Sequence, residues 1–186
     1  RTAPRFLYVG RFSSEKGLDV LLKAFKRVQH DLPNSQLVLI GAGPEAEDLR
    51  SMADTLDIGD HVIFAGSLPP EGIAQELSKA TCLILPSRSE PWGIVVNEAL
   101  SYGCPAIVSH VCGCVPELIK DGRTGFTFKT DEVSELSSAM ERAPAAFSNI
   151  QDTASRCLDA IEAYTPDAAA SAVLAGCLKV MAQTSL

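Results

Sequence analysis

The 186-residue sequence is long enough for one domain with a substantial core, and its 46% hydrophobic and 21% charged residues are typical of a globular protein. Its formal net charge of −7 argues against broad nucleic-acid binding, which needs a basic face to displace counterions. The sequence contains no apolar run long enough to span a bilayer and no recognisable signal peptide, so we expect a cytoplasmic protein.

Short apolar runs alternate with stretches of helical periodicity up to about residue 128. The predicted strands, in chain order, are Phe6–Gly10, Gln36–Gly41, His61–Ala65, Cys82–Pro86, Ala106–Ser109 and the weaker Gly125–Phe128. Between the first two strands, Leu18, Leu21 and Phe25 lie on one helical face. Strands that are apolar on both faces and separated by helices predict an α/β fold, a Rossmann-like three-layer sandwich with a mostly parallel sheet.

The remainder of the chain, from Asp131 onward, has no strong strand pattern. Val133, Leu136 and Met140 recur at helical spacing and predict the first of two or three helices in a C-terminal tail. Pro166 follows a threonine and precedes an aspartate, which favours a helix start there, because proline is tolerated at the first helical position.

In an open parallel sheet, ligands bind beyond the carboxyl ends of the strands, where helix N-termini point. The first loop of this kind runs from Gly10 to Gly17 and carries Arg11 and Lys16 beside a predicted helix start. Free backbone N–H groups and the helix dipole favour an anion there, and a diphosphate fits because arginine can bind two oxygens while lysine adds a mobile charge. The loop alone is equally compatible with a solvated turn that carries two ordinary basic residues.

The loop after the second strand, Gly41–Glu45, is similar to part of a dinucleotide-binding fingerprint. It lacks the third glycine and does not follow the first strand, so it is a weak indication of NAD binding. We interpret it as a tight turn that lines the cleft, with Pro44 at the beginning of a helix.

The loop after the fourth strand is the most informative. Pro91 and Gly93 indicate a tight turn into a helix that runs to about residue 102, and the small Gly93 lets backbone N–H groups approach a ligand closely. Glu90 precedes this helix and Glu98 lies about two turns inside it, so eight residues of helical rise separate them by about 12 Å.

That separation fits the distance from a sugar ring, past a diphosphate, to a ribose. Ionised carboxylates accept hydrogen bonds from hydroxyl groups at both ends, and the phosphates would lie between Glu90 and Glu98, across from Arg11 and Lys16. The simpler alternative is an amphipathic helix whose glutamates face solvent. We favour the functional interpretation, because a charge among apolar residues such as Val95 needs a reason. A hydrolase acid–base pair is less consistent with this separation.

Cysteines occur at positions Cys82, Cys104, Cys112, Cys114, Cys157 and Cys177. Their spacing predicts neither a disulfide framework nor a zinc ribbon, so we expect most of them to be reduced and buried. His110-x-Cys112-x-Cys114 lacks the usual two-residue gap and a second pair of ligands. We therefore predict no metal site.

Five segments in this order, from about Phe6 to Phe128, resemble the carboxy-terminal domain of family 4 glycosyltransferases. They are Tyr8–Gly17, Leu39–Glu45, Phe64–Gly66, Glu90–Ala99 with seven residues between its two glutamates, and Gly113–Ile119 with the following Asp121–Gly122 and Thr124–Phe126. The resemblance implies one half of a GT-B fold. Many relatives carry a Gly-Gly pair where this chain has Gly113-Cys114, which we interpret as tolerated loop variation.

The resemblance also implies a retaining transferase that takes a nucleotide-diphosphate sugar without a required metal or other cofactor. By that analogy, Arg11, Lys16 and Glu90 are catalytic: the two cations bind the diphosphate and stabilise the leaving group, and Glu90 holds sugar hydroxyls. Glu98 would accept from the ribose, and the backbone near residues 66–67 would border the base. The implied donor-binding residues are Gly10, Arg11, Lys16, Glu90, Pro91, Trp92, Gly93, Ile94, Val95 and Glu98.

The resemblance implies, finally, that an acceptor-binding domain with a catalytic histidine and a glycine-rich loop precedes residue 1. Residues 1–186 would then be a single donor-binding domain that transfers little sugar alone, and contact with a membrane surface through the missing half stays open. Three alternatives remain: a nucleotide-sugar epimerase, a non-catalytic nucleotide-binding or interaction domain of the same fold, and, more distantly, an NAD-dependent dehydrogenase.

Overall fold

The six predicted strands form one parallel sheet in the computed structural model, which describes residues 3–183. The strands are β1 (Arg5–Val9), β2 (Gln36–Ile40), β3 (Val62–Gly66), β4 (Cys82–Leu85), β5 (Ala106–Ser109) and β6 (Gly125–Phe128). Four predicted strands match to within one residue at each end, and the other two, β5 and β6, match at both ends. Residues 1–2 and 184–186, which the single-domain prediction includes, lie outside the described residues.

The differences at strand ends have local causes. Arg5 joins β1 because its backbone N–H donates to Thr81 Oγ1 (3.0 Å) and it pairs with Gln36 of β2. His61 does not belong to β3, because it ends a 3-10 turn, η2 (Gly59–His61), that leads into the strand. The α/β fold with a parallel sheet is confirmed.

The strand order β3-β2-β1-β4-β5-β6 places β1 beside β4, although more than 70 residues separate them. From this pair, β2 and β3 extend the sheet in one direction and β5 and β6 in the other. The order therefore reverses between β1 and β4, and the carboxyl ends of these two strands flank the position where doubly wound sheets bind ligands.

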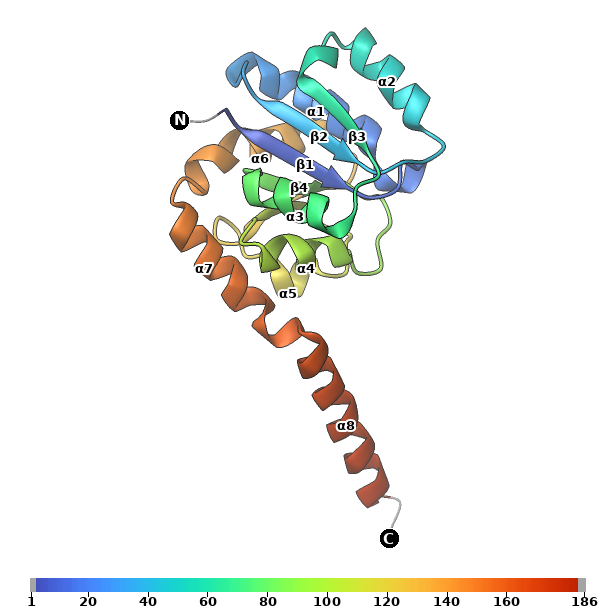
Figure 1. Ribbon diagram of the computed structural model, residues 1–186, viewed down its shortest axis with the longest axis vertical. Helices are drawn as coiled ribbons and strands as arrows, with labels where there is room; N and C mark the ends of the chain where they lie inside the picture. The colour runs from blue at the N-terminus through green and yellow to red at the C-terminus, as the bar shows by residue number, and fades with distance from the viewer. Residues whose placement is uncertain (1–2, 184–186) are drawn as a thin grey trace.

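Helices cover both faces of the sheet (Figure 1). The helices are α1 (Leu18–Asp31), α2 (Ala46–Thr55), α3 (Pro70–Lys79), α4 (Ile94–Ser101), α5 (Val115–Leu118), α6 (Val133–Ala146), α7 (Ile150–Ile161) and α8 (Pro166–Gln183). On one face α1 packs against α2 and α6, and on the other α4 packs against α7. Because both faces are covered, β4 and β5 are buried at every position.

The amphipathic pattern of α1 shows how the layers join. Its apolar residues face the sheet, and Phe25 meets Phe6 of β1 edge to face with ring centroids 6.3 Å apart. The opposite face carries Lys23, Lys26 and other exposed residues. Packing of this kind holds the sheet rigid beneath the loops at its carboxyl edge.

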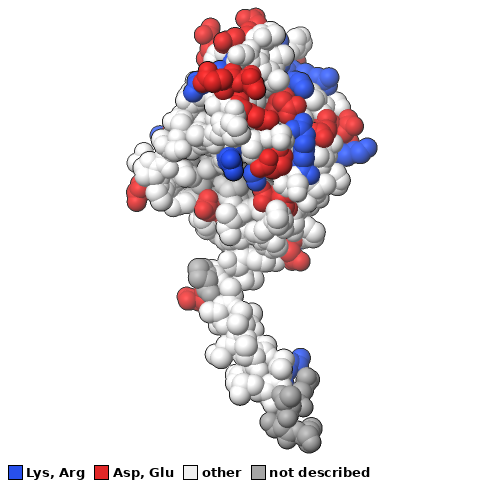
Figure 2. Space-filling view, turned by 90° about the vertical axis from the view of Figure 1, so that its right-hand side faces the viewer, with Lys and Arg blue, Asp and Glu red and all other residues white. Residues whose placement is uncertain are grey.

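The helical tail predicted after residue 131 is confirmed as α6, α7 and α8, with Pro166 as the first residue of α8. Figure 1 shows α8 extending away from the rest of the structure, and Figure 2 shows its surface to be largely uncharged. Its exposed large apolar residues are Val173, Leu174, Leu178, Val180 and Met181. None of the helices within residues 3–183 has the length and apolar character that crossing a bilayer requires.

Candidate functional site

Two loops meet at the carboxyl edge of the sheet, one after β1 and one after β4. The backbone N–H of Arg88 donates to the carbonyl oxygen of Glu15 (2.8 Å). Gly17, in the loop after β1, packs closely on the loop after β4. A Cβ atom at Gly17 would lie 2.3 Å from the carbonyl oxygen of Pro86. The Gly17 φ of 66° also favours glycine. The two loops that the sequence singles out are therefore in direct contact.

Lys16 and Glu90 meet across this contact. Lys16 is the last residue of the 3-10 turn η1 (Ser14–Lys16), and its Nζ lies 2.6 Å from Glu90 Oε2. The two side chains are 21% and 15% exposed, so the ion pair is mostly buried yet reachable from solvent. The structure thus brings together two of the three residues that the resemblance marks as catalytic.

The segment that carries Glu90 is held in place by a third loop, which follows β5. Gly113 N–H donates to the carbonyl oxygen of Glu90 (3.1 Å), and Cys114 N–H donates to that of Trp92 (3.0 Å). A Cβ atom at Gly113 would lie 2.0 Å from the carbonyl oxygen of Pro91, so this contact requires glycine. Cys114, where many relatives have glycine, is buried beneath the contact.

The helix α4 begins at this same place. Its N-cap, Gly93, has a φ of 96°, and a Cβ atom there would lie 2.8 Å from Leu85 Cδ2. Ile94, the first helical residue, is 68% exposed, so the start of the helix faces solvent. The first N–H groups of a helix lack intrahelical partners and attract anions, which makes this end of α4 suited to a phosphate.

Other predicted site residues do not converge as closely. Arg11 is exposed on the β1 loop, and its carbonyl oxygen accepts a hydrogen bond from the Tyr8 hydroxyl (2.8 Å). Burial, reinforced by the negative charges of Glu90 and Glu15, raises the pKa of Tyr8, so this hydroxyl stays protonated and able to donate. Tyr8 thus supports the loop from below while the Arg11 side chain remains at the surface.

Glu98 is exposed on α4, whereas its neighbours Val96, Ala99 and Leu100 face the core. Because the Glu98 carboxylate lies at the surface, it needs no partner to offset burial. The sequence argument that a charge among apolar residues requires a functional reason therefore does not apply to Glu98. The proposed contact with a ribose stays a prediction.

Trp92 contributes its side chain to the framework of the site. Its Nε1–H donates to Asn97 Oδ1 (2.8 Å), and its ring lies 5.8 Å from that of Tyr164, centroid to centroid. No pattern in the sequence indicates this pairing of Trp92 with Tyr164. Pro91 beside it is exposed, and Val95 is half-buried on α4.

The helix predicted to begin at Pro44 begins instead at Ala46, with Glu45 as its N-cap. The reason is the close approach of the loop to the β1 loop, where a Cβ atom at Gly43 would lie 2.2 Å from the carbonyl oxygen of Phe12. Glu45 N–H donates to the same oxygen (3.1 Å), so the chain is turned before the helix can start.

The cysteine thiols beside the site are buried. Burial, together with the nearby Cys114 and Glu90, raises the pKa of the Cys112 thiol to about 12, and burial raises that of Cys114 to about 11. Both thiols are therefore protonated at neutral pH, a form that binds metal poorly. His110 is exposed, and its Nδ1 accepts from the backbone N–H of Thr130 (3.2 Å). Within residues 3–183, no three His, Cys, Asp or Glu side chains are grouped to hold a metal ion.

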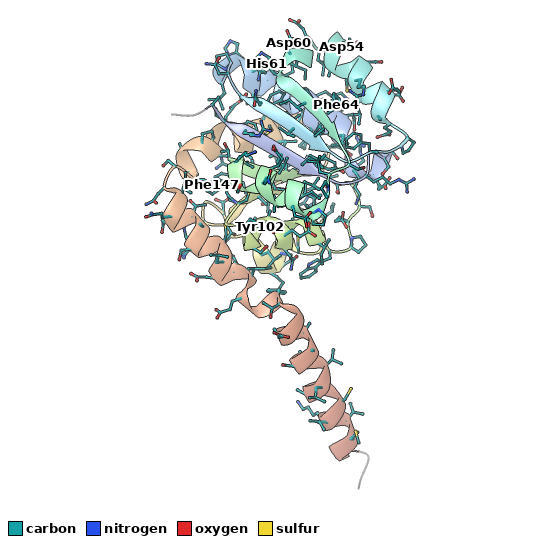
Figure 3. All side chains as sticks on the ribbon, viewed as in Figure 1. Asp54, Asp60, His61, Phe64, Tyr102 and Phe147 are labelled. Carbon is teal, nitrogen blue, oxygen red and sulfur yellow. The ribbon has the colours of Figure 1, made fainter. Side chains whose placement is uncertain are left out.

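Two shallow hollows in the described part of the chain lie away from this site. One surrounds Asp54, Asp60 and His61, which Figure 3 shows at the start of β3. The other lies between α7 and the turn that precedes β6, and Lys120 and Arg156 line it. Both are at the amino edge of the sheet, opposite the loops that carry Lys16 and Glu90.

Sequence reasoning missed Arg88, which belongs to the informative loop but was not singled out. It forms ion pairs with Asp19 of α1 and Asp131 of the turn after β6. A basic residue two positions before Glu90 was the available signal. What the sequence did not show is that three separate segments meet at its guanidinium.

A family model described as glycosyl transferases group 1 matches residues 1–145. A sulfoquinovosyl transferase of Arabidopsis thaliana is 34% identical over 135 residues, which cover 71% of this chain and 25% of that protein. A GDP-mannose-dependent phosphatidylinositol monomannoside mannosyltransferase of Mycolicibacterium smegmatis is 29% identical over 144 residues, which cover 74% of this chain and 37% of that protein.

Among solved structures, sucrose-phosphate synthase from Thermosynechococcus elongatus matches with a TM-score of 0.82 at 28% identity. The match covers 100% of this chain and 47% of that one. The chain thus spans 25% and 37% of the length of the two curated relatives, and less than half of this solved structure.

Proposed function

Because the chain belongs to the group 1 glycosyl transferases, we propose that it forms the donor-binding half of a retaining transferase that takes a nucleotide-diphosphate sugar. The observation that carries the proposal is the meeting of Lys16 and Glu90 where the strand order reverses. A cation beside a carboxylate fits a diphosphate joined to a sugar rich in hydroxyl groups. The description of one relative as GDP-mannose-dependent supports a nucleotide sugar as the donor.

The chemistry of the leaving group explains the cations. Transfer breaks the bond between the anomeric carbon and an oxygen of the diphosphate, so negative charge builds on that oxygen. Lys16 and the exposed Arg11 would neutralise this charge, aided by the start of α4. Because these groups supply the positive charge, the proposal includes no metal ion or other cofactor.

Carboxylates and backbone groups would bind the remainder of the donor. Glu90 would accept hydrogen bonds from the sugar hydroxyls, and Glu98, further along α4, would accept from the ribose. The backbone from Pro91 to Val95 would contact the phosphates and the sugar. The side chain of Trp92 would hold that backbone in place, because its indole is bonded to Asn97.

Acceptor binding is assigned to a part of the protein outside these 186 residues. The share of each relative that the chain covers supports this assignment, because 63% to 75% of the two curated relatives lies beyond the matched region. We therefore expect the chain to bind the donor and to transfer little or no sugar by itself.

Calorimetric titration of the chain with UDP, GDP, ADP and NAD tests the proposal. One nucleoside diphosphate is expected to bind more tightly than the other two and than NAD. Arg11→Ala should weaken this binding, whereas Arg27→Ala, which removes an exposed arginine from α1, should leave it unchanged. Preferential binding of NAD would contradict the proposal, and so would the absence of binding by a folded sample at millimolar nucleotide.

A further inference from the structure

Arg88 joins segments of the carboxyl edge that are far apart in the sequence. Its Nη2 donates to Asp19 Oδ1 (2.8 Å) at the start of α1, and its Nε donates to Asp131 Oδ1 (2.7 Å) after β6. Its Nη1 donates to the carbonyl oxygen of Ser14 (2.6 Å), and its backbone N–H donates to that of Glu15 (2.8 Å). The three side-chain contacts, one from each guanidinium nitrogen, suit the planar fork of a guanidinium and not a lysine ammonium.

Asp131 and Asp19, the two carboxylate partners of Arg88, each have an unusual property: Asp131 in its backbone conformation and Asp19 in its pKa. Asp131 holds a left-handed backbone with a φ of 63°, which is uncommon for a residue other than glycine. Burial alone would raise the pKa of Asp19, but the hydrogen bond and charge of Arg88 bring it below its ordinary value. The Arg88 side chain is 33% exposed, so part of the network is shielded from solvent.

The network controls the turn from which Lys16 projects. Ser14 and Glu15 are the first two residues of η1, and Lys16 is the third. The Arg88 side chain therefore holds the carbonyl group of Ser14, and the Arg88 backbone N–H holds that of Glu15. Glu90, the partner of Lys16, follows Arg88 by two residues on the same loop. Arg88 is thus bonded to the turn that carries Lys16 and lies on the loop that carries Glu90.

We propose that Arg88 is a positioning residue that fixes Lys16 against Glu90 and so prepares Lys16 to bind the diphosphate of the donor. This inference rests on the proposed function for its ligand, but the geometry of the pair is testable without any ligand. Arg88 acts through Lys16 and does not itself contact the donor.

A purely stabilising arginine is the alternative, and the chain contains a matched control for it. Arg5 also links three segments, because its guanidinium contacts Glu76 of α3 (3.2 Å) and Gln36 of β2 (2.7 Å) from its place in β1. Its side chain is 22% exposed, close to that of Arg88, but it lies at the amino edge of the sheet. Arg5→Met should therefore lower stability without affecting Lys16.

The ligand-free test measures how fast Lys16 reacts with an amine-acylating reagent, quantified by mass spectrometry relative to the exposed Lys26 of α1. Lys16 should react more slowly than Lys26 in the wild type, because the ion pair holds its ammonium. Arg88→Met and Glu90→Gln should each raise the Lys16 rate about two- to fivefold, and Arg5→Met should not. Equal rates for Lys16 and Lys26 in the wild type, or a wild-type rate in Arg88→Met, would overturn the inference.

The ligand test uses whichever of UDP, GDP and ADP binds the wild type most tightly. Arg88→Met should weaken its binding about fivefold or more, but less than about twofold when Lys16→Met is already present. Arg5→Met should leave the affinity unchanged. Equal losses with and without Lys16 would show that Arg88 does not act through Lys16, which overturns the inference.

The two tests separate the inference from the function on which it rests. If none of the nucleotides binds a folded wild type, the donor proposal is contradicted, while the acylation rates still decide whether Arg88 positions Lys16. If nucleotides bind but Arg88→Met leaves the acylation rate of Lys16 unchanged, the donor proposal stands and the proposed role of Arg88 is contradicted.

Discussion

Lys16 Nζ lies 2.6 Å from Glu90 Oε2, so the cation expected to bind phosphate and the carboxylate expected to bind sugar are each other's partner. A diphosphate that contacts Lys16 must therefore share it with Glu90. An ammonium has three N–H donors, which allows both contacts at once. If the proposed donor binds here, the pair would couple recognition of its diphosphate to recognition of its sugar.

Glu90→Gln is expected to change the affinity for a nucleoside diphosphate and for its sugar conjugate in opposite directions. The glutamine side-chain oxygen can still accept a hydrogen bond from Lys16 and keep it in place, but the negative charge that competes with phosphate is gone, so the bare diphosphate should bind about threefold more tightly. The sugar conjugate should bind more weakly, because its hydroxyls lose a charged acceptor worth about 1.5–3 kcal/mol. Calorimetry with both ligands measures this, and a parallel change for the two would refute the coupling.

Lys16→Ala should weaken diphosphate binding without unfolding the domain. The lost charge-assisted contact corresponds to about tenfold or more in affinity, whereas loss of the mostly buried pair leaves Glu90 without its cation and should cost about 1–3 kcal/mol of stability. Urea unfolding and calorimetry measure the two effects separately. Lys26→Ala, on the exposed face of α1, is the matched control, and an unchanged affinity in Lys16→Ala would remove Lys16 from the site.

Gly17→Ala and Gly122→Ala form a matched pair, because both glycines have a φ of 66°. Each alanine incurs the left-handed backbone cost of about 1–2 kcal/mol. A Cβ atom at Gly122 meets nothing within 4 Å, whereas at Gly17 it would lie 2.3 Å from the carbonyl oxygen of Pro86. Only Gly17→Ala should also push the two loops apart and weaken diphosphate binding. Equal stability and equal affinity in the two variants would contradict this reading of the loop contact.

The ion pair between Glu76 and Arg5 predicts part of the acid sensitivity of the fold. Burial favours the protonated carboxyl, but the hydrogen bond and charge of Arg5 outweigh it and lower the pKa of Glu76 below its ordinary value of 4.5. Because the folded-state pKa of Glu76 is lowered, its stabilising effect is fully present above the ordinary pKa of 4.5. The effect is lost as the pH falls through the folded-state pKa. Urea unfolding of Glu76→Gln between about pH 5 and pH 3 should therefore show a shallower pH dependence than the wild type.

Glu47→Gln provides the control for that experiment, since the Glu47 side chain is 91% exposed and lies 3.9 Å from its partner Arg50. Its pH dependence should match that of the wild type. An identical curve for Glu76→Gln and the wild type would show that the Arg5 contact does not persist in solution.

The sheet was predictable because its strands leave apolar runs in the sequence, and β1, β2, β4 and β5 are buried at most or all of their positions. The loops of the site were also predictable, because parallel strands have their carboxyl ends at one edge of the sheet and the loops that follow them therefore lie together there. Sequence alone could not show that β1 lies beside β4, and the contact between Lys16 and Glu90 depends on that neighbour relation.

Helix phase explains the faulty argument about Glu98. Val96, Ala99 and Leu100 turn toward the core, which leaves Glu98 at the surface despite its apolar neighbours in sequence. The network around Arg88 was hidden for another reason. Its partners Asp19 and Asp131 are 69 and 43 residues away, and no local pattern links them.

The position of Trp92 makes the site optically observable. It is the one tryptophan of the 186 residues, it follows Glu90 by two residues, and its indole lies against Tyr164. Fluorescence excited at the long-wavelength edge of the indole band, where tyrosine does not absorb, therefore originates two residues from Glu90 and nowhere else in the chain. Quenching or a spectral shift on adding a nucleotide would report occupancy of this edge of the sheet directly, with no label attached and no second emitter to subtract.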